Sequence, residues 1–308
     1  MQTPPLYDTV GDVAEGHPRV VALGGGHGLA ATLRAARRYA GDLTAIVSVA
    51  DDGGSSGRLR QAFNIPPPGD LRRCLVALAD PDSPWTSAFE HRFDGGGLEG
   101  HAFGNLVIAG LAEASGDFEL ALLEAGRILG AAGRVIPATR EPVILKGEVR
   151  GPDGDGGVSL LGQVAVQESG RIAGVSLIPP DPEPPQAALD ALAAADQIVI
   201  GPGSLFTSVL AVVAVPAIRA ALAATSRARK VYVCNLRPQV PETAGYDVAA
   251  HVDALRAHGL DVDVVLCHPG ALAPGPLSTT CVEMPVANDD LTAHDPLRLA
   301  AALSDLVG

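Results

Sequence analysis

Short apolar runs alternate with amphipathic stretches along most of this chain. The run Val20 to Leu23 is followed by residues 29–39, in which apolar side chains recur at positions 29, 33 and 36, and then by a second apolar run over residues 43–49. Apolar side chains spaced three to four residues apart indicate a helix, and short uninterrupted apolar runs indicate buried strands. The pattern predicts the opening β-α-β unit of a doubly wound α/β fold.

The same alternation continues toward the C-terminal end. It predicts helices over residues 71–79, 84–93, 104–113, 118–129, 186–194 and 296–306. Asp70 can serve as the N-cap of the first of these helices. Further buried strands are predicted over residues 197–200, 230–234 and 262–267. We therefore expect a Rossmann-like three-layer α/β/α fold with a mainly parallel, doubly wound sheet.

One segment departs from this pattern. Residues 143–178 contain short apolar runs at 143–149, 158–166 and 172–178, joined by Gly/Asp turns. Three consecutive strands with tight turns favour antiparallel pairing. We expect a small antiparallel β insert at a sheet edge, a flexible leader over residues 1–17, and a single α/β domain over residues 18–308 that contains the insert.

Composition and charge narrow the functional classes. The 308 residues carry a formal net charge of -13, which disfavours nucleic acid as a partner. The four cysteines are widely spaced and form no metal-binding motif, so structural thiols are expected. The N-terminal residues lack the pattern of a secretory signal, and the most apolar stretch, residues 209–218, is short for a membrane span and contains a proline. We expect a cytoplasmic protein without membrane insertion.

A glycine-rich loop follows the first strand. Its candidate ligand-binding residues are Gly25, Gly26, His27 and Gly28, and the spacing Gly26-x-Gly28-x-x-Ala31 matches a dinucleotide-binding fingerprint. Glycines allow a phosphate to approach the backbone, and the N-terminus of the following helix attracts negative charge. Asp51, at the end of the second strand, lies at the spacing expected for a carboxylate that accepts a ribose hydroxyl. An NAD-linked oxidoreductase is compatible with this loop.

A second polar run follows the second strand. Its candidate binding residues are Asp51, Asp52, Gly53, Gly54, Ser55, Ser56 and Arg58. Adjacent carboxylates can hold ribose hydroxyls or a divalent cation such as Mg²⁺, and the planar guanidinium of arginine suits a phosphate. Asp51 and Asp52 are therefore the metal candidates if the chemistry requires a metal.

Further polar residues stand beside glycines at predicted helix starts and strand ends. Two roles are possible for Asp70, Arg72, His101 and Asn105. They either contact a ligand, or they cap helices and lie on helix surfaces. A third glycine turn contributes Gly201, Gly203, Ser204 and Thr207, and Asn235 ends the strand that follows. Backbone amides and hydroxyls without formal charge suit a phosphate or a sugar, so a second phosphate-facing loop is expected.

Together these motifs resemble the YvcK family, also called the gluconeogenesis-factor or CofD-like family. The segments that carry the resemblance are Gly24-Gly-Gly-His-Gly-Leu29, the run from Val49 to Arg60, Pro67-Pro-Gly-Asp70, Gly104-Asn-Leu106, Gly201-Pro-Gly-Ser204 and Glu242-Thr243. The run Asp-Asp-Gly-Gly-Ser-Ser-Gly-Arg is the most specific of them. Two positions depart from the family pattern: His27 stands where many members carry Thr, and Gln163 stands where an acid often follows the glycine.

The resemblance implies a cytoplasmic bacterial protein that binds a nucleotide sugar such as UDP-N-acetylglucosamine and regulates cell shape, cell-wall synthesis and carbon metabolism. We expect the diphosphate against Gly25 to Gly28 and the third glycine turn, Asp51 on the ribose, and Arg58, Asn105 or Asn235 on phosphate, base or sugar. Related CofD enzymes transfer a phospholactyl group to a deazaflavin with a metal near the aspartates. That activity and NAD binding remain alternatives, and a homodimer is compatible with the sequence.

Overall fold

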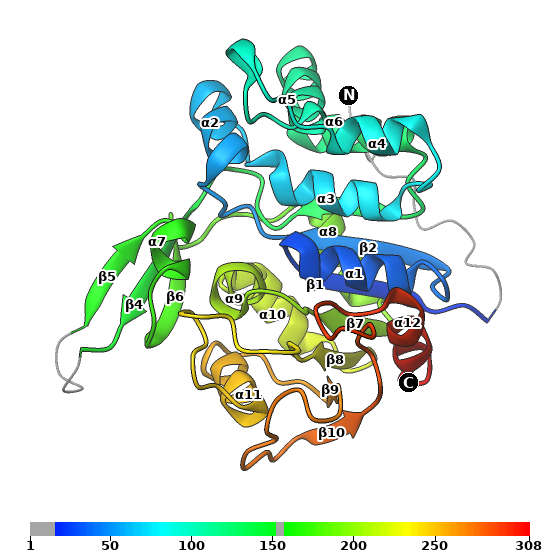
Figure 1. Cartoon of the computed structure of the whole chain (residues 1–308), viewed down its shortest axis with the longest axis vertical. Helices are drawn as coiled ribbons and strands as arrows, with labels where there is room; N and C mark the ends of the chain where they lie inside the picture. The colour runs from blue at the N-terminus through cyan, green and yellow to red at the C-terminus, as the bar shows by residue number, and fades with distance from the viewer. Residues whose placement is uncertain (1–15, 152–156) are drawn as a thin grey trace.

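The computed structural model describes residues 16–151 and 157–308 (Figure 1). The predicted leader, residues 1–17, therefore falls almost entirely outside the described residues. Within the described part, two sheets of different kinds are present. One has seven strands that all run parallel, and the other has three antiparallel strands.

The seven-stranded sheet has the order β10-β9-β8-β7-β1-β2-β3. Its strands are β1 (Arg19–Gly24), β2 (Asp42–Val47), β3 (Arg134–Pro137), β7 (Gln197–Ile200), β8 (Arg229–Val233), β9 (Val264–Cys267) and β10 (Thr280–Glu283). The central strands consist almost entirely of buried Val, Ile, Leu and Ala, as expected for parallel strands covered on both faces. The predicted parallel doubly wound sheet is confirmed.

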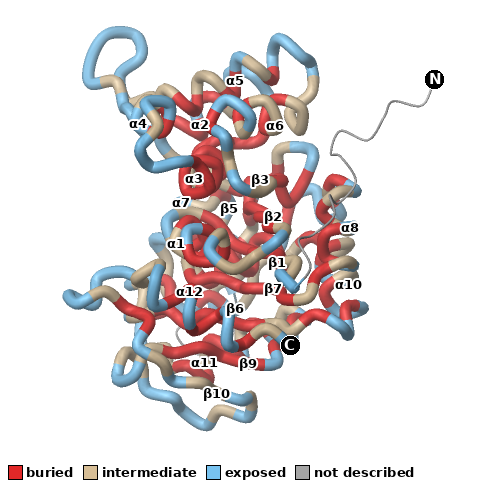
Figure 2. Tube along the Cα trace, turned by 90° about the vertical axis from the view of Figure 1, so that its right-hand side faces the viewer, coloured by how far each residue is buried: buried red, intermediate tan, exposed pale blue. Residues whose placement is uncertain are grey.

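Helices cover both faces of this sheet (Figures 1 and 2). One layer contains α1 (Gly26–Ala36), α3 (Pro68–Leu78) and α12 (Pro296–Ser304), with α1 packed against both of the others. The opposite layer contains α8 (Gln186–Ala194), α9 (Leu210–Val213) and α10 (Pro216–Ala224). A short π-helical turn, η2 (Leu205–Val209), leads into α9, and α11 (Val248–Ala257) precedes β9. The predicted three-layer arrangement is confirmed.

A group of helices extends beyond the β3 edge of the sheet, at the top of Figure 1. It comprises α2 (Gly54–Phe63), α4 (Pro84–Glu90), the 3-10 turn η1 (Gly96–Leu98), α5 (Phe103–Ser115) and α6 (Phe118–Leu129). α5 packs against α2, α3, α4 and α6, and α6 packs against β3. This group brings the N-termini of α2 and α5 toward the carboxyl end of the sheet.

The predicted β insert is present as the three-stranded antiparallel sheet. Its order is β5-β4-β6, formed by β4 (Ile144–Val149), β5 (Val158–Leu161) and β6 (Ile172–Ile178). The predicted strand over residues 158–166 was too long. The backbone at Gly162 has φ of 98°, which turns the chain out of β5 and into a short helix, α7 (Gln163–Gln167). Val166 of α7 then packs on Gly147 of β4.

Several other elements differ from the sequence-based expectation. The edge strands β3 and β10 were not predicted, because each contains only two consecutive apolar residues, Val135-Ile136 and Cys281-Val282. Helix α2, which begins at Gly54 within the polar run, was not predicted. α3 begins at Pro68 with Pro67 as its N-cap, so Asp70 lies within the first turn and is not the cap.

Among the described residues, no single helix has both the length and the apolar composition needed to cross a membrane. One bent pair, Leu205–Val213 with Pro216–Ala224, passes that test on length and composition alone.

Candidate functional site

The order of the sheet identifies where a ligand site is expected. From β1 the chain steps outward through β2 to β3, whereas from β7 it steps in the opposite direction through β8 and β9 to β10. The connections that leave β1 and β7 therefore diverge and open a crevice at the carboxyl ends of these strands. A cavity of about 520 Å³ occupies this place, lined by both connections.

The first wall is the glycine loop at the start of α1. Gly26 has a backbone φ of 62°, a conformation that residues other than glycine rarely adopt. A Cβ atom added to Gly25 would lie 2.7 Å from Oδ2 of Asp70, and one added to Gly28 would lie 2.6 Å from the carbonyl carbon of Pro202 and 2.8 Å from Cα of Gly203. The loop therefore needs glycine for two reasons, backbone conformation and direct contact with the connection after β7.

Asp51 and Asp52 diverge although they are adjacent. Asp51 lines the cavity and accepts a hydrogen bond from the backbone N–H of Gly53 at 2.9 Å. Burial, reinforced by the nearby carboxylate of Asp70, raises the pKa of Asp51. Oδ1 of Asp52 instead accepts from the backbone N–H of Val164 at 3.1 Å, and Asp52 is not part of the cavity lining. The second acidic side chain at the cavity is Asp70, which pairs with Arg73 at 2.7 Å.

Four of the sequence-predicted residues form one hydrogen-bonded chain across two helix starts. Nε of Arg72 donates to Oδ1 of Asn105 at 3.1 Å, and Nδ2 of Asn105 donates to Oγ of Ser55 at 3.1 Å. The same Ser55 hydroxyl lies 3.0 Å from Nδ1 of His101. Arg72 is only 5% exposed and Asn105 only 2%. The chain of contacts fixes the guanidinium of Arg72 at the cavity wall.

The charge at this wall is positive. Arg72 has two neutral partners, Asn105 and the carbonyl oxygen of Phe89, and no ion pair is recorded for it among the described residues. Burial, with Arg73 nearby, lowers the pKa of Arg72 to about 10, so the guanidinium stays protonated at neutral pH. Arg73 and Arg92 also line the cavity.

His27 lies beside these cations with its side chain open to solvent. The side chain is the second residue of α1 and lines the cavity together with the arginines. Partial burial lowers the pKa of His27, and Arg73 lowers it further. Asp70 raises this pKa by a smaller amount, and Arg34 lowers it slightly. The imidazole of His27 therefore stays neutral at pH values at which a histidine without these neighbours would begin to take up a proton.

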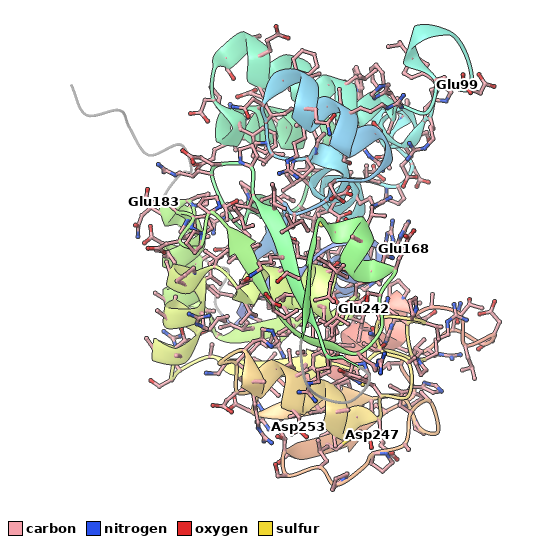
Figure 3. The ribbon with its side chains drawn as sticks, turned by 90° about the vertical axis from the view of Figure 1, so that its left-hand side faces the viewer. Glu99, Glu168, Glu183, Glu242, Asp247 and Asp253 are labelled. Carbon is pink, nitrogen blue, oxygen red and sulfur yellow. The ribbon has the colours of Figure 1, made fainter. Side chains whose placement is uncertain are left out.

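The connection after β7 is held in place by its neighbours. Asn235 donates to the carbonyl oxygen of Gly203 at 2.9 Å and accepts from the backbone N–H of Gly203 at 3.1 Å. Glu242, labelled in Figure 3, accepts from the backbone N–H groups of Phe206 and Thr207 at 2.7 and 3.2 Å. These amides are thereby occupied by a protein carboxylate. Gly203 and Ser204 line the cavity, while Asn235 and Thr207 act behind it.

Most of the sequence-predicted residues meet at the cavity. Those that line it are Gly25, Gly26, His27, Gly28, Asp51, Gly53, Gly54, Ser55, Ser56, Asp70, Arg72, Asn105, Gly203 and Ser204. Those outside the lining are Asp52, Arg58, His101, Gly201, Thr207 and Asn235. Arg58 is exposed and donates to the carbonyl oxygen of Glu99 at 2.9 Å, away from the expected phosphate.

Sequence reasoning missed part of the lining. The additional residues are Gly69, Arg73, Arg92, Gln163, Val164, Gln167, Ser208 and Gln239. Arg73 directly follows Arg72 in the sequence, and this doubled arginine was an available signal. Gln163 stood out only as a departure from the family pattern. Gln167 and Gln239 carried no signal, because they come from the insert and from the connection after β8, which the sequence does not join to the glycine loop.

Comparisons with known proteins agree with this architecture. The family model for 2-phospho-L-lactate transferase CofD matches residues 20–298. A relative from Mycobacterium tuberculosis is 45% identical over 305 residues, which is 92% of this chain and 89% of the relative. The gluconeogenesis factor of Bacillus subtilis is 43% identical over 78% of this chain and 75% of its own.

A solved structure shares the fold as well. The crystal structure of a UPF0052 family member from Bacillus halodurans superposes with a TM-score of 0.86 at 36% identity, covering 94% of this chain and 99% of that one. The sequence matches extend across the glycine loop, the aspartate run and the insert. The chain therefore belongs to the CofD family, alongside the members called gluconeogenesis factors, which form the YvcK family.

Proposed function

We propose that this protein binds a nucleotide sugar of the UDP-N-acetylglucosamine type in the cavity between β1 and β7, and that it acts in the cytoplasm as a regulator of cell-wall and carbon metabolism. The observation that carries the proposal is the buried guanidinium of Arg72, which faces the cavity with neutral partners. A buried cation without a carboxylate partner is costly unless an anion completes the site.

The surroundings of Arg72 support a diphosphate as that anion. Helices α1 and α2 begin at the cavity, with Gly26 and Gly54 in its lining. Both helices therefore direct the backbone N–H groups and the positive dipole of their N-termini toward it. Arg73 and Arg92 add further donors. Asp51 lies at the end of β2, beside the glycine loop, where the carboxylate suits a ribose hydroxyl.

A melting experiment tests the proposal. UDP-N-acetylglucosamine at about a hundred times its Kd should raise the free energy of unfolding by about 2.7 kcal/mol. The panel includes UDP, UDP-N-acetylglucosamine and NAD, each with and without Mg²⁺. A shift with NAD and none with the uridine nucleotides would support the dinucleotide alternative and reject this proposal.

A phospholactyl transferase is the second candidate, and the match to the CofD model favours it. Mg²⁺ is held by one or two carboxylates together with substrate phosphates. Asp51 and Asp70, which both line the cavity, fit that role better than Asp52, whose Oδ1 is bonded to α7. When bound, the metal would supply charge stabilisation at the phosphoryl group. Product formation from a phospholactyl nucleotide and a deazaflavin with Mg²⁺ would establish this activity.

A further inference from the structure

Three glutamines contribute to the cavity lining in addition to the arginines. Gln163 and Gln167 lie four residues apart on α7, so they share one face of that helix, and Gln239 comes from the connection after β8. The part of the lining that α7 and Gln239 form has no formal charge on its side chains, because Val164 is the remaining contribution of α7. This part of the lining differs chemically from the part that the arginines form.

The amide groups of these glutamines lack protein partners. Among the residues that the structure describes, none of the three side-chain amides takes part in a recorded hydrogen bond, and Oε1 of Gln239 is shielded from solvent without a donor to bond to it. A buried polar atom without a partner costs free energy. A ligand group with both donors and acceptors would satisfy all three amides.

The order of the sheet indicates which part of a nucleotide sugar reaches these glutamines. Along the crevice the strands run β2, β1, β7 and β8. Asp51 for the ribose follows β2, the glycine loop for the diphosphate follows β1, and Gln239 follows β8, at the opposite end from the ribose. The α7 helix spans this line: Val164 lies against Asp52 and Gly53, which follow β2, and the helix also packs against η2, which follows β7. Gly170, just after α7, lies near Pro241 of the connection after β8, so α7 runs from the aspartate run toward Gln239. A nucleotide sugar laid along this line places its glycosyl group toward the Gln239 end of α7.

We propose that Gln163, Gln167 and Gln239 form the subsite for the glycosyl group of the nucleotide sugar, and that the insert therefore determines which sugar is accepted. This inference rests on the proposed nucleotide-sugar function. Sugar hydroxyls and an N-acetyl amide both donate and accept hydrogen bonds, as does a glutamine amide. Asp52 is a positioning residue for this subsite, since its carboxylate holds the backbone of α7.

The test measures binding of UDP and of UDP-N-acetylglucosamine by calorimetry to the full chain and to Gln163→Ala, Gln167→Ala and Gln239→Ala. Each variant should weaken UDP-N-acetylglucosamine binding about 3- to 10-fold, as expected for loss of one neutral hydrogen bond, and leave UDP binding within about twofold. Gln186→Ala is the matched control, because Gln186 is an exposed glutamine on α8 outside the cavity. Its affinities should equal those of the unmodified chain.

Three results would overturn the inference. Equal loss of affinity for UDP and UDP-N-acetylglucosamine would assign the glutamines to the nucleotide portion. Unchanged affinities in all three variants, with melting temperatures confirming folded protein, would remove them from the site. Equal affinity of the unmodified chain for both ligands would mean that no glycosyl subsite exists. Failure of the unmodified chain to bind either ligand would instead reject the nucleotide-sugar function itself, and it is recognised before any variant is made.

Discussion

Oδ1 of Asp52 accepts a hydrogen bond from the backbone N–H of Val164 at 3.1 Å, across 112 positions of sequence. Asp52 follows β2 of the parallel sheet, and Val164 belongs to α7 of the antiparallel insert. The neighbouring Gly162 has no room for a side chain, because an added Cβ atom would overlap Oδ2 of Asp52. One carboxylate thus joins the insert to the main sheet at the edge of the cavity.

Replacement of Asp52 separates a positioning role from a metal-binding role. Asp52→Asn keeps an oxygen acceptor for the N–H of Val164, whereas Asp52→Ala removes it. We expect Asp52→Ala to speed hydrogen exchange in residues 163–167 and to abolish the preference for UDP-N-acetylglucosamine over UDP. Asp52→Asn should retain both properties. Equal defects in the two variants would indicate that the charge of Asp52 is required, as in a metal ligand.

Arg72 should contribute much of the affinity for a diphosphate. Arg72→Met removes the cation and the hydrogen bond to Asn105 while keeping an apolar stem in the buried position. Because charged hydrogen bonds are worth about 1.5–3 kcal/mol, UDP affinity should fall about 10- to 150-fold. Calorimetry measures the change. Arg127→Met, at an exposed arginine of α6, is the control and should bind UDP normally.

The contact between the two glycine connections makes Gly28→Ala destabilising. The added methyl group would meet the backbone of Pro202 and Gly203. We expect the free energy of unfolding to fall by about 1–3 kcal/mol, which denaturant titration measures. Gly110→Ala is the comparison, because Gly110 is exposed in α5 with nothing within 4 Å of an added Cβ atom. That variant should gain about 0.5–1 kcal/mol, and a loss similar to that of Gly28→Ala would contradict the steric explanation.

His27 should take up a proton when an anion binds. In the free protein, burial and Arg73 keep the pKa of His27 below its ordinary value of 6.5. A phosphate beside the imidazole favours the charged form and raises that pKa. Calorimetry at about pH 6 in two buffers with different heats of ionisation should report proton uptake with UDP. His27→Asn should abolish the uptake, and identical uptake in this variant would assign the proton to another group.

His258 should make the attachment of the insert sensitive to acid. Nε2 of His258 accepts from the backbone N–H of Val175 in β6 at 3.0 Å, so the ring must be neutral at that nitrogen. Burial, with Arg219 nearby, lowers the pKa of His258 in the folded state. The unfolded chain therefore binds the proton more readily than the folded protein. The contribution of His258 to stability is complete above pH 6.5, the ordinary pKa of histidine, and is lost as the pH falls through the lowered pKa of the folded state.

Denaturant midpoints at about pH 7.5 and pH 5.5 test this behaviour. His258→Asn should show a smaller difference between the two midpoints than the unmodified chain. Other histidines whose pKa is lowered in the folded state, among them His251 and His294, contribute to the pH dependence that remains. An unchanged difference in the His258 variant would contradict the assignment.

The fold and the gathering of the glycine loop and the aspartate run at one cavity could be predicted because their signals are local. The glycine loop, the aspartate run and the apolar strands each lie within a few consecutive residues, and the geometry of a parallel sheet brings strand ends together. Arg72, Asn105 and Ser55 were singled out separately, and the structure joins them in one hydrogen-bonded chain. Their mutual contact was not readable from the sequence.

The remaining site depends on long-range packing. Asp52 and Arg58 have the residue types of a binding site, yet Asp52 bonds to α7 and Arg58 to the carbonyl oxygen of Glu99. Residue type gives chemical capacity, while the direction of a side chain depends on the turn that carries it. Gln239 reaches the cavity because the connection after β8 folds back over β7, a path without a local sequence signature.

The insert is a separate small sheet whose α7 is held to the cavity by a side chain of the parent sheet. This arrangement makes the insert a unit that is structurally distinct from the parallel sheet. Residues 144–178 could be exchanged with those of a relative while the seven parallel strands and their glycine loops stay intact. If the proposed function holds, exchanging the insert would alter the sugar specificity while the glycine loops stay unchanged, and a chimaera with a grafted insert would be a route to sensors of new nucleotide sugars.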